Sequence, residues 1–174
     1  MLNYIIICII MLLIIMIIKI VNILVEFKRQ ADNALYQIDS QIKRRIDLIP
    51  NLVEIIKANT ALEEAAFERL IEARASLMRG GTIVERAQAQ NEFDCALTTL
   101  LTATESYLEL TTDENFIFLK DELSNAENSI NVSRERYNSS VRKYNQLIQQ
   151  VPGNIIANIM GYACKEFFNA DKVS

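Results

Sequence analysis

The side chains of this chain that could carry chemistry are carboxylates, arginines and three cysteines, because histidine is absent. Without histidine the chain lacks the commonest general base and metal ligand, which excludes Ser-His and Cys-His nucleophile pairs. Cys8, Cys95 and Cys164 match no zinc or redox spacing, and we predict that Cys95 is a small buried hydrophobe on an apolar helix face. The only glycine pair is Gly80-Gly81, so no glycine-rich phosphate loop is present. These features predict a protein that is not an enzyme, with no cofactor, metal or small-molecule substrate.

Two groups of polar residues lie beside apolar helical positions and are the candidate interaction or register-fixing residues. The groups are Arg44, Arg45, Asp47, Asn51 and Glu54, and then Glu127, Asn128, Arg134, Asn138 and Asn145. Such residues can form a surface for a partner helix, or they can satisfy one another inside a bundle and fix helix register. We favour the second interpretation.

The elements that must position these residues begin with an uncharged segment, Met1 to Ile18. At about 1.5 Å of rise per residue, it is long enough to cross the hydrocarbon core of a bilayer as a helix. A cleaved signal peptide would have a basic residue before the apolar run and a small-residue cleavage site, and neither is found here. We therefore predict a retained single-pass transmembrane anchor within residues 1–25, in contact with membrane lipid through residues 2–18.

Charge on the two sides of the anchor predicts its orientation. Basic residues lie only on its C-terminal side, beginning with Lys19, Lys28 and Arg29. The positive-inside rule then places the N-terminus outside and residues 26–174 in the cytoplasm, at the cytoplasmic (inner) cell membrane. These residues are enough for one ordinary domain. The net charge of −4 argues against nucleic acid as a partner.

A heptad stripe of apolar and small residues predicts a long helix in the C-terminal part of the chain. Its members are Phe116, Leu119, Leu123, Ala126, Ile130, Ser133, Tyr137, Ser140, Tyr144, Leu147 and Val151. Pro152-Gly153 should end this helix, and Thr111-Thr112-Asp113 should form the turn and N-cap before it. Residues 35–56, 62–77 and 87–108 present three further apolar helical faces, and strand-like alternation is missing.

The first of these segments must break before the second. We favour a break at Asp47–Pro50, because Pro50 disfavours helical geometry at the residue before it. The alternative is a break at Asn59-Thr60, where Thr60-x-x-Glu63 has the pattern of a capping box. Either choice gives an all-α fold, with the transmembrane helix followed by an antiparallel up-and-down four-helix bundle.

Arg45 occupies an apolar slot of the first helical segment. It is either a buried, paired arginine or the end of the helix. Because the first and last helices of such a bundle are neighbours, Glu122 and Glu127 are the carboxylates best placed to meet one of Arg44 and Arg45, if the turn at Asp47 lies at the membrane-distal end of the bundle. A desolvated Arg–Glu pair would hold the register of the two helices.

The tail after Pro152 is apolar. It carries Ile155, Ile156, Ile159, Met160, Tyr162, Phe167 and Phe168. These residues either cap the end of the bundle or contact lipid, and we favour the first interpretation.

Two separated segments resemble the hallmarks of the LemA family. The first is QIKRRIDLIPNLVEIIK, residues 41–57, and the second is ENFIFLKDELSNAENSINVSRERYNSSVRKYNQLIQQVPGNIIA, residues 114–157. The closing Gly161, Phe168 and Ala170 are also similar to the family pattern, whereas Leu108–Thr111 and Val151 depart from it. The resemblance implies a single-pass membrane protein with a cytoplasmic helical bundle, and it implies no settled biochemical activity.

The functional hypothesis is a membrane-anchored interaction or scaffold module with an unidentified protein partner at the membrane. An inert anchor joined to amphipathic helices favours it. The alternative is a membrane-remodelling or lipid-sensing protein that uses its C-terminal apolar tail.

Overall fold

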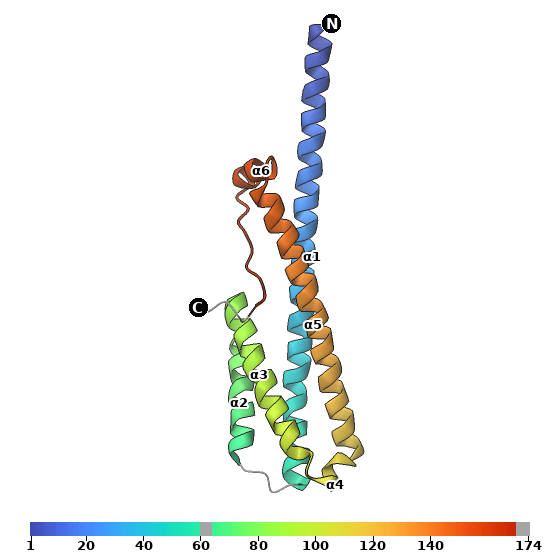
Figure 1. The fold of residues 1–174 in the computed structure, drawn as a ribbon, viewed down its shortest axis with the longest axis vertical. Helices are drawn as coiled ribbons and strands as arrows, with labels where there is room; N and C mark the ends of the chain where they lie inside the picture. The colour runs from blue at the N-terminus through green and yellow to red at the C-terminus, as the bar shows by residue number, and fades with distance from the viewer. Residues whose placement is uncertain (60–63, 170–174) are drawn as a thin grey trace. The chain divides into compact units, whose positions relative to one another are not determined.

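The computed structural model describes residues 1–59 and 64–169, which are helical apart from short connections and a C-terminal tail (Figure 1). The helices are α1 (Leu2–Asn59), α2 (Glu64–Arg79), α3 (Ile83–Thr104), α4 (Leu108–Thr111), α5 (Glu114–Gln149) and α6 (Gly153–Met160). No strand occurs in these two ranges, which confirms the all-α class.

Helix α1 contains the uncharged N-terminal segment. It is the one helix within the described ranges that is long and apolar enough to cross a membrane, and its most apolar window is not buried at all. The core helix of a water-soluble fold would bury such a window. Among the side chains of α1 that the structure describes, the first buried one is Leu24, six residues after Ile18.

The predicted helix break at Asp47–Pro50 is wrong, because α1 continues through Pro50 to Asn59. A proline inside a helix lacks the N–H that would bond to the carbonyl four residues earlier, here that of Ile46. In this structure Arg74 of α2 replaces that donor, and its Nε donates to the Ile46 carbonyl oxygen at 3.1 Å. The alternative prediction, a break at Asn59-Thr60 with the Thr60-x-x-Glu63 pattern, falls on residues 60–63, which lie outside the described residues.

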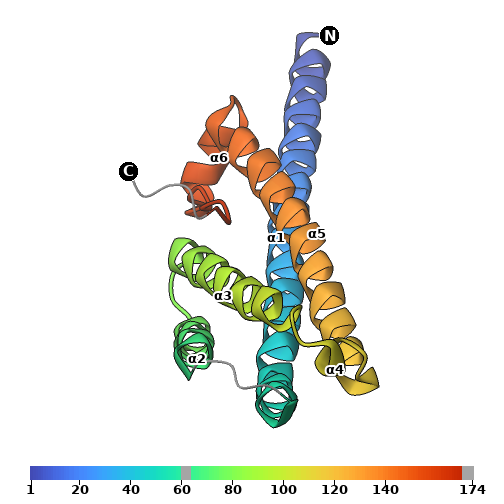
Figure 2. The ribbon, with the colours of Figure 1, turned by 60° about the horizontal axis from the view of Figure 1, so that its bottom comes forward.

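The chain divides into two compact units, and α1 and α5 contribute to both. Unit 1 comprises Met1–Leu35 and Glu135–Phe167, and unit 2 comprises Tyr36–Arg134 with the chain from Phe168. In unit 2, α2 and α3 lie side by side in both ribbon views (Figures 1 and 2). The core of unit 2 includes Ile38, Ile42, Ile49, Leu52, Ile56, Phe67, Leu70, Phe93, Leu100, Leu123 and Ile130, and that of unit 1 includes Leu24, Ala31, Ala34, Val141, Tyr144, Ile156 and Ala157.

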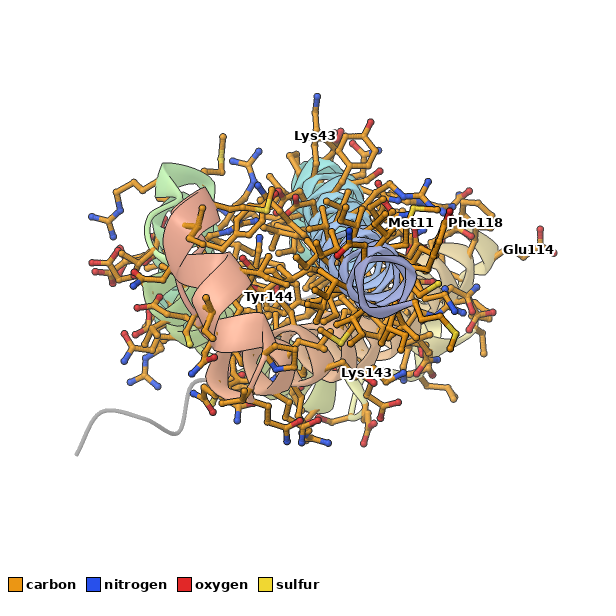
Figure 3. All side chains as sticks on the ribbon, turned by 90° about the horizontal axis from the view of Figure 1, so that it is seen from above. Met11, Lys43, Glu114, Phe118, Lys143 and Tyr144 are labelled. Atoms are coloured by element: carbon orange, nitrogen blue, oxygen red, sulfur yellow. The ribbon has the colours of Figure 1, made fainter. Side chains whose placement is uncertain are left out.

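The heptad stripe of α5 is confirmed from Phe116 to Tyr144, where every member is buried, the two serines included. Tyr144 lies among the packed side chains, whereas Lys43, Glu114 and Phe118 extend outward (Figure 3). The stripe does not reach Val151, which is exposed because α5 ends at Gln149.

The starts and ends of the helices follow local hydrogen-bonding chemistry. Asp113 caps α5, and its Oδ1 accepts from the Phe116 N–H at 2.9 Å, as the N-cap prediction requires. Helix α3 begins after Thr82, which forms a capping box with Glu85, and ends at Thr104 rather than at the predicted Leu108.

Candidate functional site

Arg45 of α1 is the centre of a polar network in unit 2. Its side chain is only 1% exposed, and its Nη1 donates to Oδ1 of Asp94 on α3 at 2.5 Å. Its Nη2 lies 3.9 Å from Oε2 of Glu127 on α5. The guanidinium carbon lies 5.0 Å from the ring centroid of Phe93, a cation–π distance. Of the two possibilities for Arg45, the structure therefore has the buried, paired arginine, and this residue joins three helices.

Asp94 receives a second donor from its own helix. The Nε2 of Gln90, which is buried, donates to Oδ1 and Oδ2 of Asp94 at 3.0 and 3.2 Å. Within the described part of the chain, the buried Nε of Arg45 and Oε1 of Gln90 have no hydrogen-bond partner. We call Arg45, Gln90, Asp94 and Glu127 the Arg45 network. Its cation is desolvated, so the free energy of unfolding depends on Asp94 staying in contact with Arg45.

Two further ion pairs connect helices of unit 2. Arg44 Nη2 pairs with Oε2 of Glu122, which joins α1 to α5, and Arg86 pairs with Asp39, which joins α3 to α1. The Arg44 side chain is 52% exposed, so solvent screens its pair far more than it screens Arg45. Three arginines thus set the register of α1 against its neighbours.

In unit 1, Asn145 of α5 holds the C-terminal tail by a reciprocal pair of hydrogen bonds. Its Nδ2 donates to the Lys165 carbonyl at 2.8 Å, and its Oδ1 accepts from the Lys165 N–H at 2.9 Å. The Tyr137 hydroxyl donates to the Glu166 carbonyl at 2.9 Å, and Lys165 Nζ pairs with Asp32 of α1 at 2.7 Å. The tail is therefore fixed by its backbone as well as by its side chains.

The other predicted residues have separate surroundings. In unit 2 the Arg134 guanidinium lies 5.5 Å from the ring centroid of Phe168. Asn138 is half-buried on α5. Asp47 is exposed and lines a groove of about 390 Å³ between α1 and the turn that joins α2 to α3. The remaining three, Asn51, Glu54 and Asn128, are exposed.

The ten predicted residues therefore do not form one site. Arg45 and Glu127 belong to the Arg45 network, and Asn145 belongs to the tail contacts. Asp94, Gln90 and Arg74 were missed by sequence reasoning. The available signal was Gln90 and Asp94 spaced by four residues on one helix face, next to an apolar stripe that contains Phe93.

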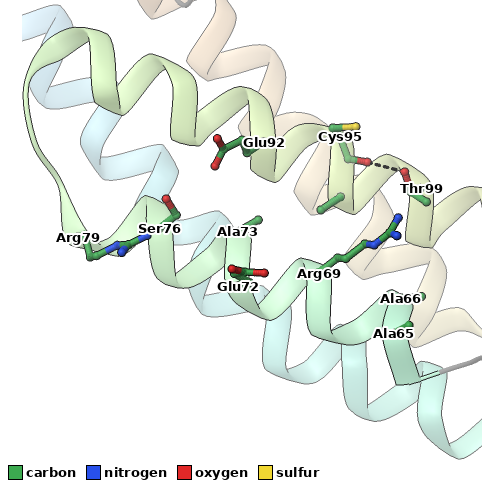
Figure 4. Close-up of a pocket in the computed structure, with 11 residues that line it drawn as sticks. Ala65, Ala66, Arg69, Glu72, Ala73, Ser76, Arg79, Glu92, Cys95 and Thr99 are labelled. Carbon is green, nitrogen blue, oxygen red and sulfur yellow. Dashed lines mark hydrogen bonds between the residues drawn. The ribbon is translucent and has the colours of Figure 1, made fainter.

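A groove of about 600 Å³ runs between α2 and α3 in unit 2 (Figure 4). Small side chains line much of it, from Ala65, Ala66, Ala73, Ser76, Ala96 and Thr99, with the charged Arg69, Glu72, Arg79 and Glu92 among them. Cys95 also lines this groove and is exposed, so the prediction of a buried Cys95 is wrong. The reason is that the facing side chains of α2 and α3 are small, so they leave a groove between the two helices in which Cys95 stays exposed.

No cluster of three or more His, Cys, Asp or Glu side chains that could hold a metal ion occurs in the described ranges. Residues 34–174 of the sequence match the family model of the LemA family. The sequence matches none of the curated proteins with which it was compared.

Proposed function

Because the chain belongs to the LemA family, we propose that it is a single-pass membrane-anchored interaction module without enzymatic activity, which holds a protein partner at the cytoplasmic face of the cell membrane. The observation that carries this proposal is the continuity of α1. One helix of 58 residues, about 87 Å at 1.5 Å of rise per residue, contains both the exposed apolar segment and Arg45.

Continuity matters because it joins the anchor to the folded part without a flexible linker. Crossing the hydrocarbon core takes roughly 20 residues of α1. The following turns of the same helix supply Ile38, Ile42 and Arg45 to the interior of unit 2. A partner bound to unit 2 is then joined to the membrane segment through one continuous helix.

The same proposal takes the helical segments of unit 2 in α1, α2, α3 and α5 as an antiparallel up-and-down four-helix bundle. Support comes from contacts between helices that are distant in the sequence, above all Arg45 with Asp94 and Glu127. The basic residues that follow Ile18 favour the cytoplasmic side for this bundle.

We assign the partner surface to the groove between α2 and α3. Its small side chains permit close approach of a helix, and its mixed charges suit an amphipathic partner helix with apolar residues at i, i+3 or i+4 positions. Arg69 and Arg79 would pair with acidic residues of that helix, and Glu72 and Glu92 with basic residues. A partner helix of this kind would cover Cys95.

Photocrosslinking in intact membranes tests this assignment. A photoreactive amino acid at Ala96, inside the groove, should give a discrete adduct, whereas one at the exposed Thr98, about 200° away around α3, should not. Ala66→Phe, which fills the groove, should abolish the Ala96 adduct. Adducts of equal yield at both positions, or an Ala96 adduct that persists in Ala66→Phe, would contradict the proposal.

Topology is tested at a position outside the groove, because a bound partner would cover Cys95. In a background with the three native cysteines replaced by alanine, a membrane-impermeant thiol reagent should label Glu114→Cys, at an exposed position at the start of α5, only after cells are permeabilised. Labelling in intact cells would contradict the proposed orientation and place the folded part outside the cell.

A further inference from the structure

A second uncharged segment lies at the opposite end of the sequence from the anchor. Residues 144–164 contain no charged side chain, and the segment is bounded by Lys143 and Lys165. It includes the last residues of α5, all of α6 and the first residues of the tail.

Helix α6 is apolar on two faces, and only one of them is covered by the protein. Ile156 and Ala157 are 8% and 1% exposed, so they form the packed face. Ile155 and Ile159, spaced by four residues and therefore neighbours on the helix surface, are 57% and 81% exposed. An uncharged helix that presents two isoleucines to its surroundings is unusual on a protein surface in contact with water alone.

Contacts along α1 and α5 place the start of α6 along the length of α1. In unit 1, Lys143 Nζ of α5 lies 5.6 Å from the ring centroid of Phe27 on α1, and the two helices run antiparallel (Figure 1). Gln149, six residues further along α5 and at its end, is therefore level with about residue 21 of α1.

Residue 21 is only about 4.5 Å beyond Ile18, the last residue of the uncharged N-terminal segment, at 1.5 Å of rise per residue. The tail then returns along α1, with Lys28 Nζ 5.4 Å from the Tyr162 ring centroid and Lys165 paired with Asp32. The headgroup region of a bilayer extends roughly 5–7 Å from each side of its hydrocarbon core. Within unit 1, α6 therefore begins at the level of α1 where headgroups would surround it.

We propose that α6 is a second membrane contact, whose face with Ile155 and Ile159 inserts among the lipid headgroups of the bilayer that α1 spans. The inference rests on the proposed function in that it requires α1 to be in the membrane. Lys19, Lys28 and Lys143 lie near this level and would attract anionic headgroups. With α6 in the interface, α1 is held at two points instead of one, which restricts its tilt and its rotation about the helix axis.

Depth-dependent quenching in the full chain tests the proposal. The three cysteines are replaced by alanine, and a nitrobenzoxadiazole probe is attached to Ile159→Cys after reconstitution into vesicles of phosphatidylcholine and phosphatidylglycerol. The matched control is Phe118→Cys, an exposed position 31 residues before the end of α5, which corresponds to about 46 Å along that helix. Lipids with a spin label near the headgroup should quench the Ile159→Cys probe roughly twofold or more relative to the control, because interfacial helices insert by about 5–10 Å.

A second pair of variants separates membrane contact from general effects of charge. Ile155→Glu should reduce the quenching of the Ile159→Cys probe, and Phe118→Glu, at a side chain of similar exposure, should leave it unchanged. Both positions face outward, so neither variant removes a buried group.

The outcomes distinguish this inference from the proposed function. Equal quenching at positions 159 and 118, in protein that resists alkaline extraction from the vesicles, would overturn the α6 contact and leave the anchor intact. If the probe at position 159 becomes more protected from water as the protein-to-lipid ratio rises, but is not quenched by the spin-labelled lipid, a second copy of the protein covers α6. That result would also overturn the α6 membrane contact. Release of the protein by alkaline extraction would overturn the anchor, and with it both proposals.

Discussion

The chain has two prolines, and the helix continues through one of them but ends near the other. Pro50 lies inside α1, which continues for nine more residues. Pro152 lies between two helices, because α5 ends at Gln149 and α6 begins at Gly153. The residue type alone therefore does not determine whether the helix ends. What differs is whether another element supplies the hydrogen bond that the proline cannot.

At Pro50 the replacement donor is a cation from a different helix. Arg74 donates to the Ile46 carbonyl, and in the same unit the buried Arg45 binds Asp94. Both contacts connect α1 to neighbouring helices by side chains, so this region depends on long-range packing. It should unfold together with the rest of unit 2.

At Pro152 the chain uses backbone geometry instead. A Cβ on Gly153 would overlap the carbonyl oxygen of Leu147, so only glycine permits this close turn. After α6, Asn145 binds the Lys165 backbone at both its N–H and its carbonyl. These contacts are local to the tail and should be lost without unfolding α5.

The largest effect expected from this comparison is at Arg45. Arg45→Met should lower the free energy of unfolding by about 3 kcal/mol, the lower end of the range for breaking a buried pair, because Asp94 keeps a side-chain exposure of 29%. Urea unfolding of the full chain in detergent micelles, followed by circular dichroism, measures it.

The matched control is Arg44→Met, at a side chain that is half-exposed, which should cost about 0–1 kcal/mol. Equal losses for the two variants would show that burial of Arg45 does not govern the stability of this region.

A double-mutant cycle between Arg74 and Pro50 tests the assignment of the replacement donor. Arg74→Met should cost about 1–3 kcal/mol, because the Ile46 carbonyl loses its donor. In the Pro50→Ala background the cost should be smaller, because the alanine N–H can bond to the same carbonyl, and the coupling should be about 1 kcal/mol. Additive losses, with no coupling, would mean that Arg74 stabilises α2 and α1 by packing alone.

The tail contacts should give a smaller and local effect. Asn145→Ala removes two hydrogen bonds to Lys165, so amide hydrogen exchange in residues 162–167 should accelerate, equivalent to about 1–2 kcal/mol of local stability. Exchange in unit 2 should not change. Asn131→Ala, at an exposed asparagine of the same helix, is the control. Acceleration throughout unit 2 would show that the two proline regions are not energetically separate.

Sequence periodicity was sufficient for α5, because a heptad stripe needs only local spacing to identify the buried face. It also singled out Arg45 as an exception within an apolar stripe. It failed at Pro50, because the compensating Arg74 comes from another helix, 28 positions away from Ile46. It failed at Cys95 for a related reason, since the groove above that residue depends on how α2 and α3 pack.

The smallest expected effect concerns the exposed start of α3. A proline lacks a backbone N–H donor, whereas the first residues of a helix have N–H donors with no partner inside the helix. The Glu85 carboxylate accepts from the Thr82 backbone N–H at 2.8 Å and from its hydroxyl at 3.0 Å. These two hydrogen bonds hold the pKa of Glu85 below its ordinary value of 4.5, and the bond from the Thr82 backbone contributes more than the bond from its hydroxyl. Because the folded-state pKa is lowered, the stabilisation is complete above about pH 4.5 and is lost as the pH falls through the folded-state pKa.

Glu85→Gln keeps an acceptor for Thr82 but cannot titrate, so the difference in urea midpoint between wild type and this variant should shrink on acidification. Glu105→Gln, at an exposed glutamate just after α3, is the control and should not show this convergence. A difference between wild type and Glu85→Gln that stays constant with pH would show that the capping box does not contribute through the charge of Glu85.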